Sequence, residues 1–171
     1  MQTTEPSSSI VYRKPTPGDA GAVWRLVKES GALDANSAYC YMLLFLHFAE
    51  TCLIAEREGR IQGFVTAYVP PTDSRALFVW QIAVAPEARG RGVAKALLRR
   101  LLELPAGRRA ERLEATVSPN NALSRRLFEA LARDRGAPCE TIAGEGFAAE
   151  AFPEQGHEAE PLLRIRLKPD H

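Results

Sequence analysis

The sequence predicts an α/β (α+β) fold, with a mixed central sheet flanked by helices, and three observations support this. The chain has 171 residues, 46% of them hydrophobic, which suits one packed core. Strand-like and helix-like apolar patterns alternate along most of its length. The run LFVWQIAVA (residues 77–85) is apolar on both faces, as expected of a strand inside a sheet. We expect one domain over residues 10–171, preceded by a short disordered tail at 1–9.

The composition excludes several classes of function. A net charge of +1 gives no general attraction to nucleic acid or to a membrane surface. No segment approaches the ~18 uncharged apolar residues of a membrane span, and the first residues lack the pattern of a signal peptide. The three cysteines, without C-x-x-C spacing, indicate neither a disulfide framework nor a zinc site. We therefore expect a cytoplasmic protein with no metal, nucleic acid or membrane partner.

The N-terminal half contains patterns typical of one strand, two helices and a hairpin. In chain order they are the strand IVYRKPT (10–16), the helix TPGDAGAVWRLVKES (16–30), the turn LDANS (33–37) with the apolar helical segment after it, and the strands TCLIAE (51–56) and IQGFVTAYV (61–69) around the turn REGR.

The C-terminal half continues from the central strand with helices and further strands. An amphipathic helix follows, with Ala94, Leu97, Leu98, Leu101 and Leu102 in phase. The stretch PAGRR breaks this helix, and RLEATV (112–117) predicts another strand. The pattern SPNNALSRRLFEALARD predicts a helix with Ser118 as its N-cap, and LLRIRL (162–167) predicts a last strand.

The stretch between the central strand and the amphipathic helix has the composition of an anion site. It comprises Arg89, Gly90, Arg91, Gly92, Val93 and Ala94. The first amides of a helix lack intrahelical partners, and glycines allow the backbone to approach a ligand closely. The arginines add charge that pairs with phosphate. We expect this loop to hold a phosphate or pyrophosphate.

The loop pattern narrows the choice of phosphate ligand. The P-loop pattern is absent. The dinucleotide pattern G-x-G-x-x-G requires a small residue at the position of Lys95, although Glu114 has the spacing, about twenty residues, of the acidic residue in that pattern. The stretch RGRGVA fits Q/R-x-x-G-x-G/A and resembles the pyrophosphate loop of the GNAT superfamily of acyl-CoA-dependent N-acyltransferases. The order of predicted elements also resembles the GNAT fold, from about Val11 to the end of the chain.

The resemblance implies an acyl-CoA as co-substrate and assigns contacts for it. The central strand would splay from its neighbour, and its backbone at Ile82, Ala83 and Val84 would pair with the pantetheine arm. Asn120, at the head of the next helix, would contact the same arm, although SPNN is also good helix-capping chemistry.

Longer stretches carry a closer resemblance over most of the chain. They are LDANSAYCYMLLFLHFAETCLIAE, GFVTAYVPP, LFVWQIAVAPEARGRGVAKALL, LEATVSPNNALSRRLF and GHEAEPLLRI. Together they resemble the diaminobutyrate acetyltransferases of ectoine biosynthesis. The resemblance implies acetyl transfer from acetyl-CoA to the γ-amino group of L-2,4-diaminobutyrate. It also implies a homodimer, for which the apolar segment 41–48 is either interface or core.

A diamino acid presents two ammonium groups and a carboxylate, so the site needs carboxylates and hydrogen-bond donors. Asp34, in the turn LDANS, is an ammonium anchor or a turn former. Tyr39, with Tyr41 as a weaker rival, binds substrate or packs, and Trp80 forms a wall of the site or part of the core. The resemblance favours substrate contact for Asp34, Tyr39 and Trp80, and Glu114 is a secondary acidic candidate.

The stretch QGHEAE supplies the candidates for proton transfer. The residues alone favour a solvated turn with a surface histidine, whereas the resemblance assigns His157 and Glu160 to the substrate. The usual superfamily glutamate is missing from residues 77–85, and Phe128 stands where a tyrosine acid is common. We expect the base among Glu160, His157, Asp34 or water. We also expect direct attack in a ternary complex, because no cysteine has an activating partner in the sequence.

Three alternatives stay open at this point. One is an acetyltransferase for another small diamine or a polyamine. The second is a catalytically silent acyl-CoA-binding regulatory module, which the missing glutamate and tyrosine keep open. The third is a dinucleotide-binding fold, against which Lys95 argues.

Overall fold

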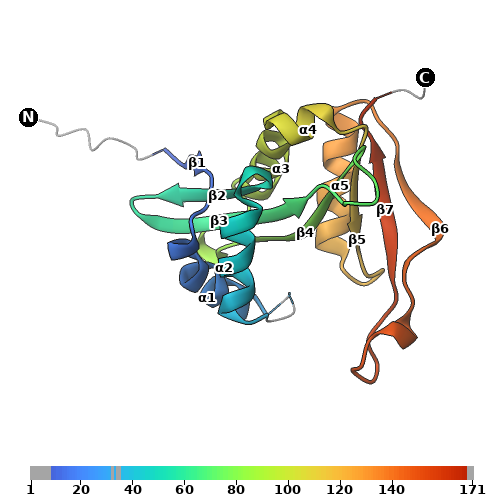
Figure 1. Ribbon diagram of the computed structural model, residues 1–171, viewed down its shortest axis with the longest axis horizontal. Coiled ribbons are helices and arrows are strands. Elements are labelled where there is room, and N and C mark those ends of the chain that lie inside the picture. The colour runs from blue at the N-terminus through green and yellow to red at the C-terminus, as the bar shows by residue number, and fades with distance from the viewer. Residues whose placement is uncertain (1–8, 32, 34–35, 169–171) are drawn as a thin grey trace, which may run out of the picture.

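A seven-stranded mixed sheet organises the computed structural model, which describes residues 9–31, 33 and 36–168 (Figure 1). The strands lie in the order β1-β2-β3-β4-β5-β7-β6, with β4 and β5 parallel and the other neighbours antiparallel. The strands are β1 Val11–Arg13, β2 Cys52–Arg57, β3 Arg60–Tyr68, β4 Ala76–Val84, β5 Arg112–Thr116, β6 Cys139–Phe147 and β7 Glu160–Arg166. The α-helices are α1 Ala20–Ser30, α2 Ala38–His47, α3 Val93–Glu103, α4 Pro105–Arg109 and α5 Ala122–Asp134. The predicted mixed sheet with flanking helices is confirmed.

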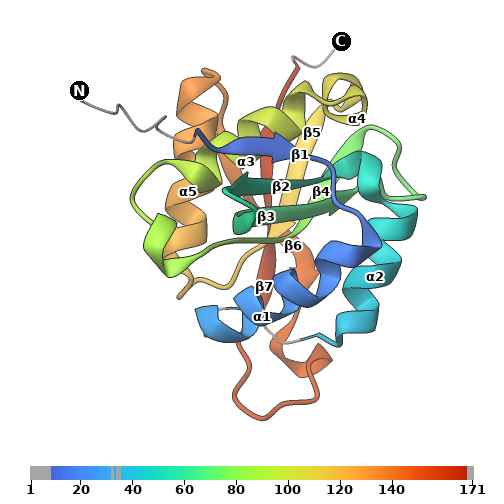
Figure 2. The same cartoon turned by 90° about the vertical axis from the view of Figure 1, so that its left-hand side faces the viewer.

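Helices cover both faces of the N-terminal part of the sheet (Figure 2). Successive residues of a strand point to opposite faces. Phe64 of β3 points to one face of the sheet, where its ring contacts that of Tyr41 in α2. The neighbouring Gly63 points to the other face, where an added Cβ would contact Leu97 of α3. The apolar stripe of α3 is buried as predicted, apart from the half-buried Ala94. The core therefore lies on both sides of β2, β3 and β4.

The parallel strands β4 and β5 separate after a short pairing. Only Ala76–Phe78 of β4 pair with β5, at Arg112–Glu114. Beyond that point β5 stays with β7, while β4 stays with β3 through a register shift at Trp80, a β-bulge. The other backbone edge of β4, from Val79 to Val84, has no strand partner in the described part of the chain. The predicted splay of the central strand is confirmed.

One local prediction, the N-cap of α5, is wrong, and two elements go beyond the sequence patterns. Helix α3 ends at Glu103, as the break at PAGRR predicts, and PAGRR itself forms the short helix α4, with Pro105 at its first position, where a proline costs no hydrogen bond. Helix α5 begins at Ala122 with Asn121 as its N-cap, and the Asn121 side chain accepts from the Ser124 amide at 3.1 Å. Ser118 does not cap because its hydroxyl donates to Glu158. The second additional element is β6, for which the sequence patterns give no prediction.

Candidate active site

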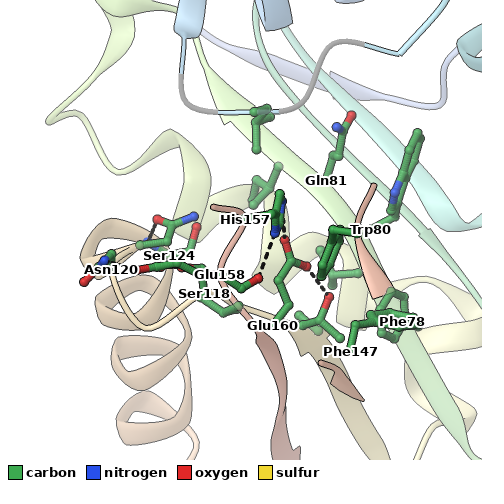
Figure 3. A pocket seen from close by; sticks show the side chains of 18 of the residues that line it. Phe78, Trp80, Gln81, Ser118, Asn120, Ser124, Phe147, His157, Glu158 and Glu160 are labelled. Carbon is green, nitrogen blue, oxygen red and sulfur yellow. Dashed lines mark hydrogen bonds and ion pairs between the residues drawn. The ribbon is translucent and has the colours of Figure 1, made fainter. Parts of the chain in front are cut away.

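The gap between β4 and β5 is a cleft of about 870 Å³ (Figure 3). Besides these strands, the start of α5 and the segment leading into β7 line it. Its aromatic side chains are Tyr68, Phe78, Trp80, Phe128, Phe147 and Phe152. Its polar and charged side chains include Gln81, Thr116, Ser118, Asn120, Ser124, His157, Glu158 and Glu160. A cleft that combines aromatic walls with converging polar groups is typical of a small-molecule site.

His157 and Glu160 face each other within this cleft. The Thr116 hydroxyl donates to Oε2 of Glu160 at 2.9 Å, and Nε2 of His157 lies 4.0 Å from Oε1. The ring of Phe152 stacks on that of His157, with the ring centres 3.7 Å apart. The structure thus brings together the two residues predicted for proton transfer and leaves both partly accessible from the cleft.

Trp80 lines the same cleft from the bulge in β4, as predicted for a wall of the site. Its ring lies 6.0 Å from that of Tyr41, whose hydroxyl donates to Oε1 of the buried Gln81 at 2.6 Å. Burial raises the pKa of the Tyr41 phenol, so it remains a hydrogen-bond donor at neutral pH. Tyr41 is fully buried and does not line the cleft, so it supports β4 from behind.

Two predicted substrate contacts lie elsewhere. Tyr39 is 66% exposed on α2 and is not among the residues that line the cleft. Glu114 is buried, but its carboxylate accepts from Arg164 at 2.7 Å and Arg112 at 3.3 Å and does not line the cleft either. These arginines explain how an acidic residue is tolerated inside the sheet. Asp34 lies outside the described residues, whereas Leu33 and Asn36 line the cleft.

The predicted anion loop lies at the end of β4. Gly90 and Gly92 have φ values of +73° and +74°, which side chains other than glycine rarely adopt. Gly92 is the N-cap of α3, so the first amides of this helix, which have no intrahelical acceptor, adjoin the exposed Arg89 and Arg91. The open backbone edge of β4 runs from the cleft, which Ile82 lines, through Ala83 and Val84 to this loop.

The sequence interpretation missed Glu158 as a residue of the site. Its carboxylate accepts hydrogen bonds from the Ser118 hydroxyl and the Asn120 amide. Asn120 is therefore neither the helix cap nor isolated, because its side chain joins the start of α5 to the segment before β7. The only signal in the sequence was the position of Glu158 inside GHEAE, beside His157.

Comparisons with known proteins agree with this geometry. The chain is 42% identical to the L-2,4-diaminobutyric acid acetyltransferase of Halalkalibacterium halodurans, over 92% of this chain and 82% of that protein. It is 44% identical to the L-2,4-diaminobutyric acid acetyltransferase of Bordetella parapertussis, over 96% of this chain and 89% of that protein. The chain belongs to the L-2,4-diaminobutyric acid acetyltransferase family.

Structural comparison gives the same family. A diaminobutyrate acetyltransferase from Paenibacillus lautus, solved with its substrate L-2,4-diaminobutyric acid and coenzyme A, superposes with a TM-score of 0.90. That protein is 44% identical, with 96% of this chain and 99% of the other covered. Residues 22–132 also match the acetyltransferase (GNAT) family model. Ard1 from Thermoplasma volcanium, 16% identical with a TM-score of 0.76, shares the fold.

This acetyltransferase family member lacks two groups that many GNAT enzymes use. β4 carries no carboxylate, and Phe128 offers no hydroxyl where it lines the cleft. Among the described residues that line the cleft, the imidazole and carboxylate side chains are those of His157, Glu158 and Glu160. The described part of the chain holds no cluster of side chains suited to a metal ion, and none of its helices is long and apolar enough to cross a membrane.

Proposed function

We propose that this chain transfers the acetyl group of acetyl-CoA to the γ-amino group of L-2,4-diaminobutyrate. The proposal rests on the similarity of this chain to the P. lautus enzyme, whose complex contains both L-2,4-diaminobutyric acid and coenzyme A. The product is an intermediate of ectoine biosynthesis, which implies a role in osmoadaptation. The free thiols of Cys40, Cys52 and Cys139 support a cytoplasmic location.

The open edge of β4 and the glycine loop fit acetyl-CoA. The pantetheine arm would pair with the backbone of Ile82, Ala83 and Val84, as an added strand does. The pyrophosphate would lie against the amides and arginines of Arg89, Gly90, Arg91, Gly92, Val93 and Ala94 at the start of α3. Asn120 remains a proposed contact of the arm, since it lines the same cleft as Ile82.

The acceptor would lie between the thioester and the side chains of His157 and Glu160. Glu160 would attract one ammonium group of the acceptor, and Trp80 would cover the acceptor's methylene chain. We retain Asp34 as the anchor of the second ammonium group. The exposed Tyr39 and the arginine-paired Glu114 are not included in this site.

The amine must lose a proton before it attacks. An ordinary primary amine has a pKa near 10.4, so freeing its lone pair at pH 7 costs roughly 4–5 kcal/mol. Nε2 of His157 would take that proton, and the Glu160 carboxylate, 4.0 Å away, would stabilise the resulting imidazolium. The departing thiolate needs no protein acid, because thiols have pKa values near 8.5.

Attack would be direct, in a ternary complex. An acyl-enzyme would need a reactive thiolate, but burial raises the pKa of the Cys52 thiol to about 11. Burial likewise raises the pKa of Cys139.

Release of free coenzyme A tests the proposed function. Acetyl-CoA would be mixed with L-2,4-diaminobutyrate, ornithine, lysine, 1,3-diaminopropane or spermidine in parallel. The expected result is rapid thiol release with diaminobutyrate alone. Faster release with another amine would assign a different acceptor, and binding of acetyl-CoA without release by any amine would indicate a regulatory module.

We also propose a homodimer that forms through α2. Tyr41 and Phe45 of this helix are buried, whereas Tyr39, Met42, Leu43 and Leu46 form an exposed apolar stripe. The helix contains no Asp, Glu, Lys or Arg, so two copies can approach without charge repulsion. In analytical ultracentrifugation, Leu46→Asp should give monomers, while Leu123→Asp, at an exposed leucine of α5, should not. A monomeric wild type would contradict the dimer.

A further inference from the structure

Glu158 joins two parts of the cleft that are distant in the sequence. It lies in the segment between β6 and β7, and both oxygens of its carboxylate accept hydrogen bonds from the loop before α5. The donors are the Ser118 hydroxyl and the Asn120 amide, and Figure 3 shows these side chains gathered beside Glu158. Hydrogen bonds to an ionised acceptor are stronger than those between neutral groups, so we call this set of contacts the Glu158 clasp.

The main chain of the same residue holds His157. Nδ1 of the ring lies 2.7 Å from the Glu158 carbonyl oxygen. A carbonyl oxygen can only accept, so Nδ1 carries the proton of the neutral ring, and the lone pair is on Nε2. Nε2 is the atom that faces Glu160 (Figure 3). The stacked ring of Phe152 limits how far the imidazole can rotate out of its present plane.

We propose that Glu158 is a positioning residue for proton transfer. The Glu158 clasp fixes the carbonyl of Glu158, and this carbonyl fixes the orientation and the tautomer of His157. This rests on the proposed function, in which one N–H bond of the acceptor's ammonium breaks and its electron pair stays on the amine nitrogen. The proton forms a new bond to Nε2, and the imidazolium lies beside the Glu160 carboxylate. A ring protonated on Nε2 cannot accept that proton.

The segment before β7 has anchors other than the Glu158 clasp. The Val117 amide donates to the Pro161 carbonyl at 3.2 Å, and the rings of Phe147 and Phe152 meet edge to face, 6.4 Å apart. Loss of the clasp should therefore leave the fold intact and change the histidine ring. That expectation separates positioning from general support of the fold.

Nitrogen NMR of the histidine rings tests the tautomer without any substrate. The chain has three histidines, so comparison with His157→Gln assigns the His157 signals. At a pH where the rings are neutral, the wild type should show His157 protonated on Nδ1, and Glu158→Ala should shift it toward the Nε2-protonated form. A wild-type ring protonated on Nε2, or an unchanged tautomer in Glu158→Ala, would overturn the proposal whatever the acceptor is.

Kinetics test the consequence. Glu158→Ala should lower kcat by about 10- to 100-fold, the range expected for a misplaced catalytic group, with little change in either KM. Ser118→Ala, which removes one donor to the Glu158 carboxylate, should lower kcat in the same direction, and adding it to Glu158→Ala should cost little more. The control is Glu154→Ala, at an exposed glutamate of the same segment, which should keep wild-type kcat. If Glu158→Ala changed only the KM for acetyl-CoA, or if the losses of kcat in the combined variant were fully additive, the positioning role would be refuted. If the wild type does not acetylate diaminobutyrate, the proposed function fails, but the NMR result still decides the role of Glu158.

Discussion

Glu160 has a different task for each of its two carboxylate oxygens. Oε2 accepts from Thr116, which holds the carboxylate at the first residue of β7, and Oε1 faces the His157 ring. In the proposed mechanism, a carboxylate in this position would attract the acceptor's ammonium and would stabilise the imidazolium that forms when the proton is transferred. Both effects depend on its negative charge.

Glu160→Gln keeps the shape of this side chain and removes the charge. We expect kcat to fall by about 10²- to 10⁴-fold, the usual contribution of a group that assists proton transfer. Steady-state kinetics with diaminobutyrate measure this, and Glu154→Gln is the charge-matched control. A Glu160→Gln enzyme with wild-type kcat would remove Glu160 from the mechanism.

Sequence motifs predicted some of these residues and not others for physical reasons. Trp80, His157 and Glu160 line the cleft because each stands at the point where β4 bulges or β7 begins. Tyr39 does not, because it lies on the face of α2 opposite the buried Tyr41 and Phe45. Charged partners from other strands, such as the arginines on Glu114, are invisible in a local pattern.

At the level of elements, Arg13 ties β1 to its neighbours. Its guanidinium donates to Asp19 at 2.8 and 2.9 Å and to Glu56 of β2 at 2.6 and 2.9 Å. The hydrogen bonds from Arg13 lower the pKa of the Asp19 carboxyl below 3.8. β1 has only three residues, so this bidentate contact supplies much of what holds it at the sheet edge.

Asp19→Asn should therefore destabilise the protein in a pH-dependent way. At pH 7 we expect the free energy of unfolding to fall by about 1.5–3 kcal/mol, as for hydrogen bonds to charged groups. Because the folded pKa of Asp19 is depressed, its contribution is present above about 3.8 and is lost as the pH falls through the folded value. Urea unfolding at pH 7 and pH 3 should show the difference from wild type narrowing. A difference that stays constant with pH would contradict a contribution from the ion pair between Arg13 and Asp19. Glu87→Gln, at an exposed glutamate, is the control.

Gly146 sets the register where β6 meets the start of β7. Its φ is +103°, and a Cβ there would lie 2.3 Å from the Glu160 carbonyl oxygen and 2.6 Å from the Leu162 amide nitrogen. Gly144 also has a positive φ, +77°, but a Cβ there would meet nothing within 4 Å. The two glycines therefore separate backbone strain from steric contact with β7.

Gly146→Ala should cost about 2–5 kcal/mol of stability and also lower kcat, because β7 must move at Glu160. Gly144→Ala should cost about 1–2 kcal/mol through backbone strain and keep wild-type kcat. Thermal unfolding and activity assays of both variants measure this. Equal losses in the two variants would contradict the close contact between β6 and β7.

The elements themselves were predictable to different degrees. The strands β2, β3 and β4 and the helices α1 and α3 bury one or both faces, so their apolar periodicity is clear. β6 is mostly exposed and contains two glycines, so no alternating pattern marks it. The start of α5 was misplaced because Ser118 has a distant partner, Glu158, that competes with capping.

Over the whole molecule, one separation of strands accounts for both proposed substrate sites. Where β4 leaves β5, it exposes a backbone edge toward the glycine loop, and the gap beside it becomes the cleft with His157 and Glu160. An acyl-CoA arm along that edge and an amine in the cleft would then meet at Ile82 and Trp80. Fixed positions for both reactants supply much of the rate acceleration that acyl transfer requires.

The central claim is that this cleft directs one particular amine to the thioester. The most direct test is to incubate the protein with L-2,4-diaminobutyrate and acetyl-CoA carrying ¹³C in the acetyl group, and to locate the label by NMR. The account predicts the label only on the γ-nitrogen, with the α-ammonium unmodified. Label on the α-nitrogen, a mixture of the two products, or no transfer at all would contradict it.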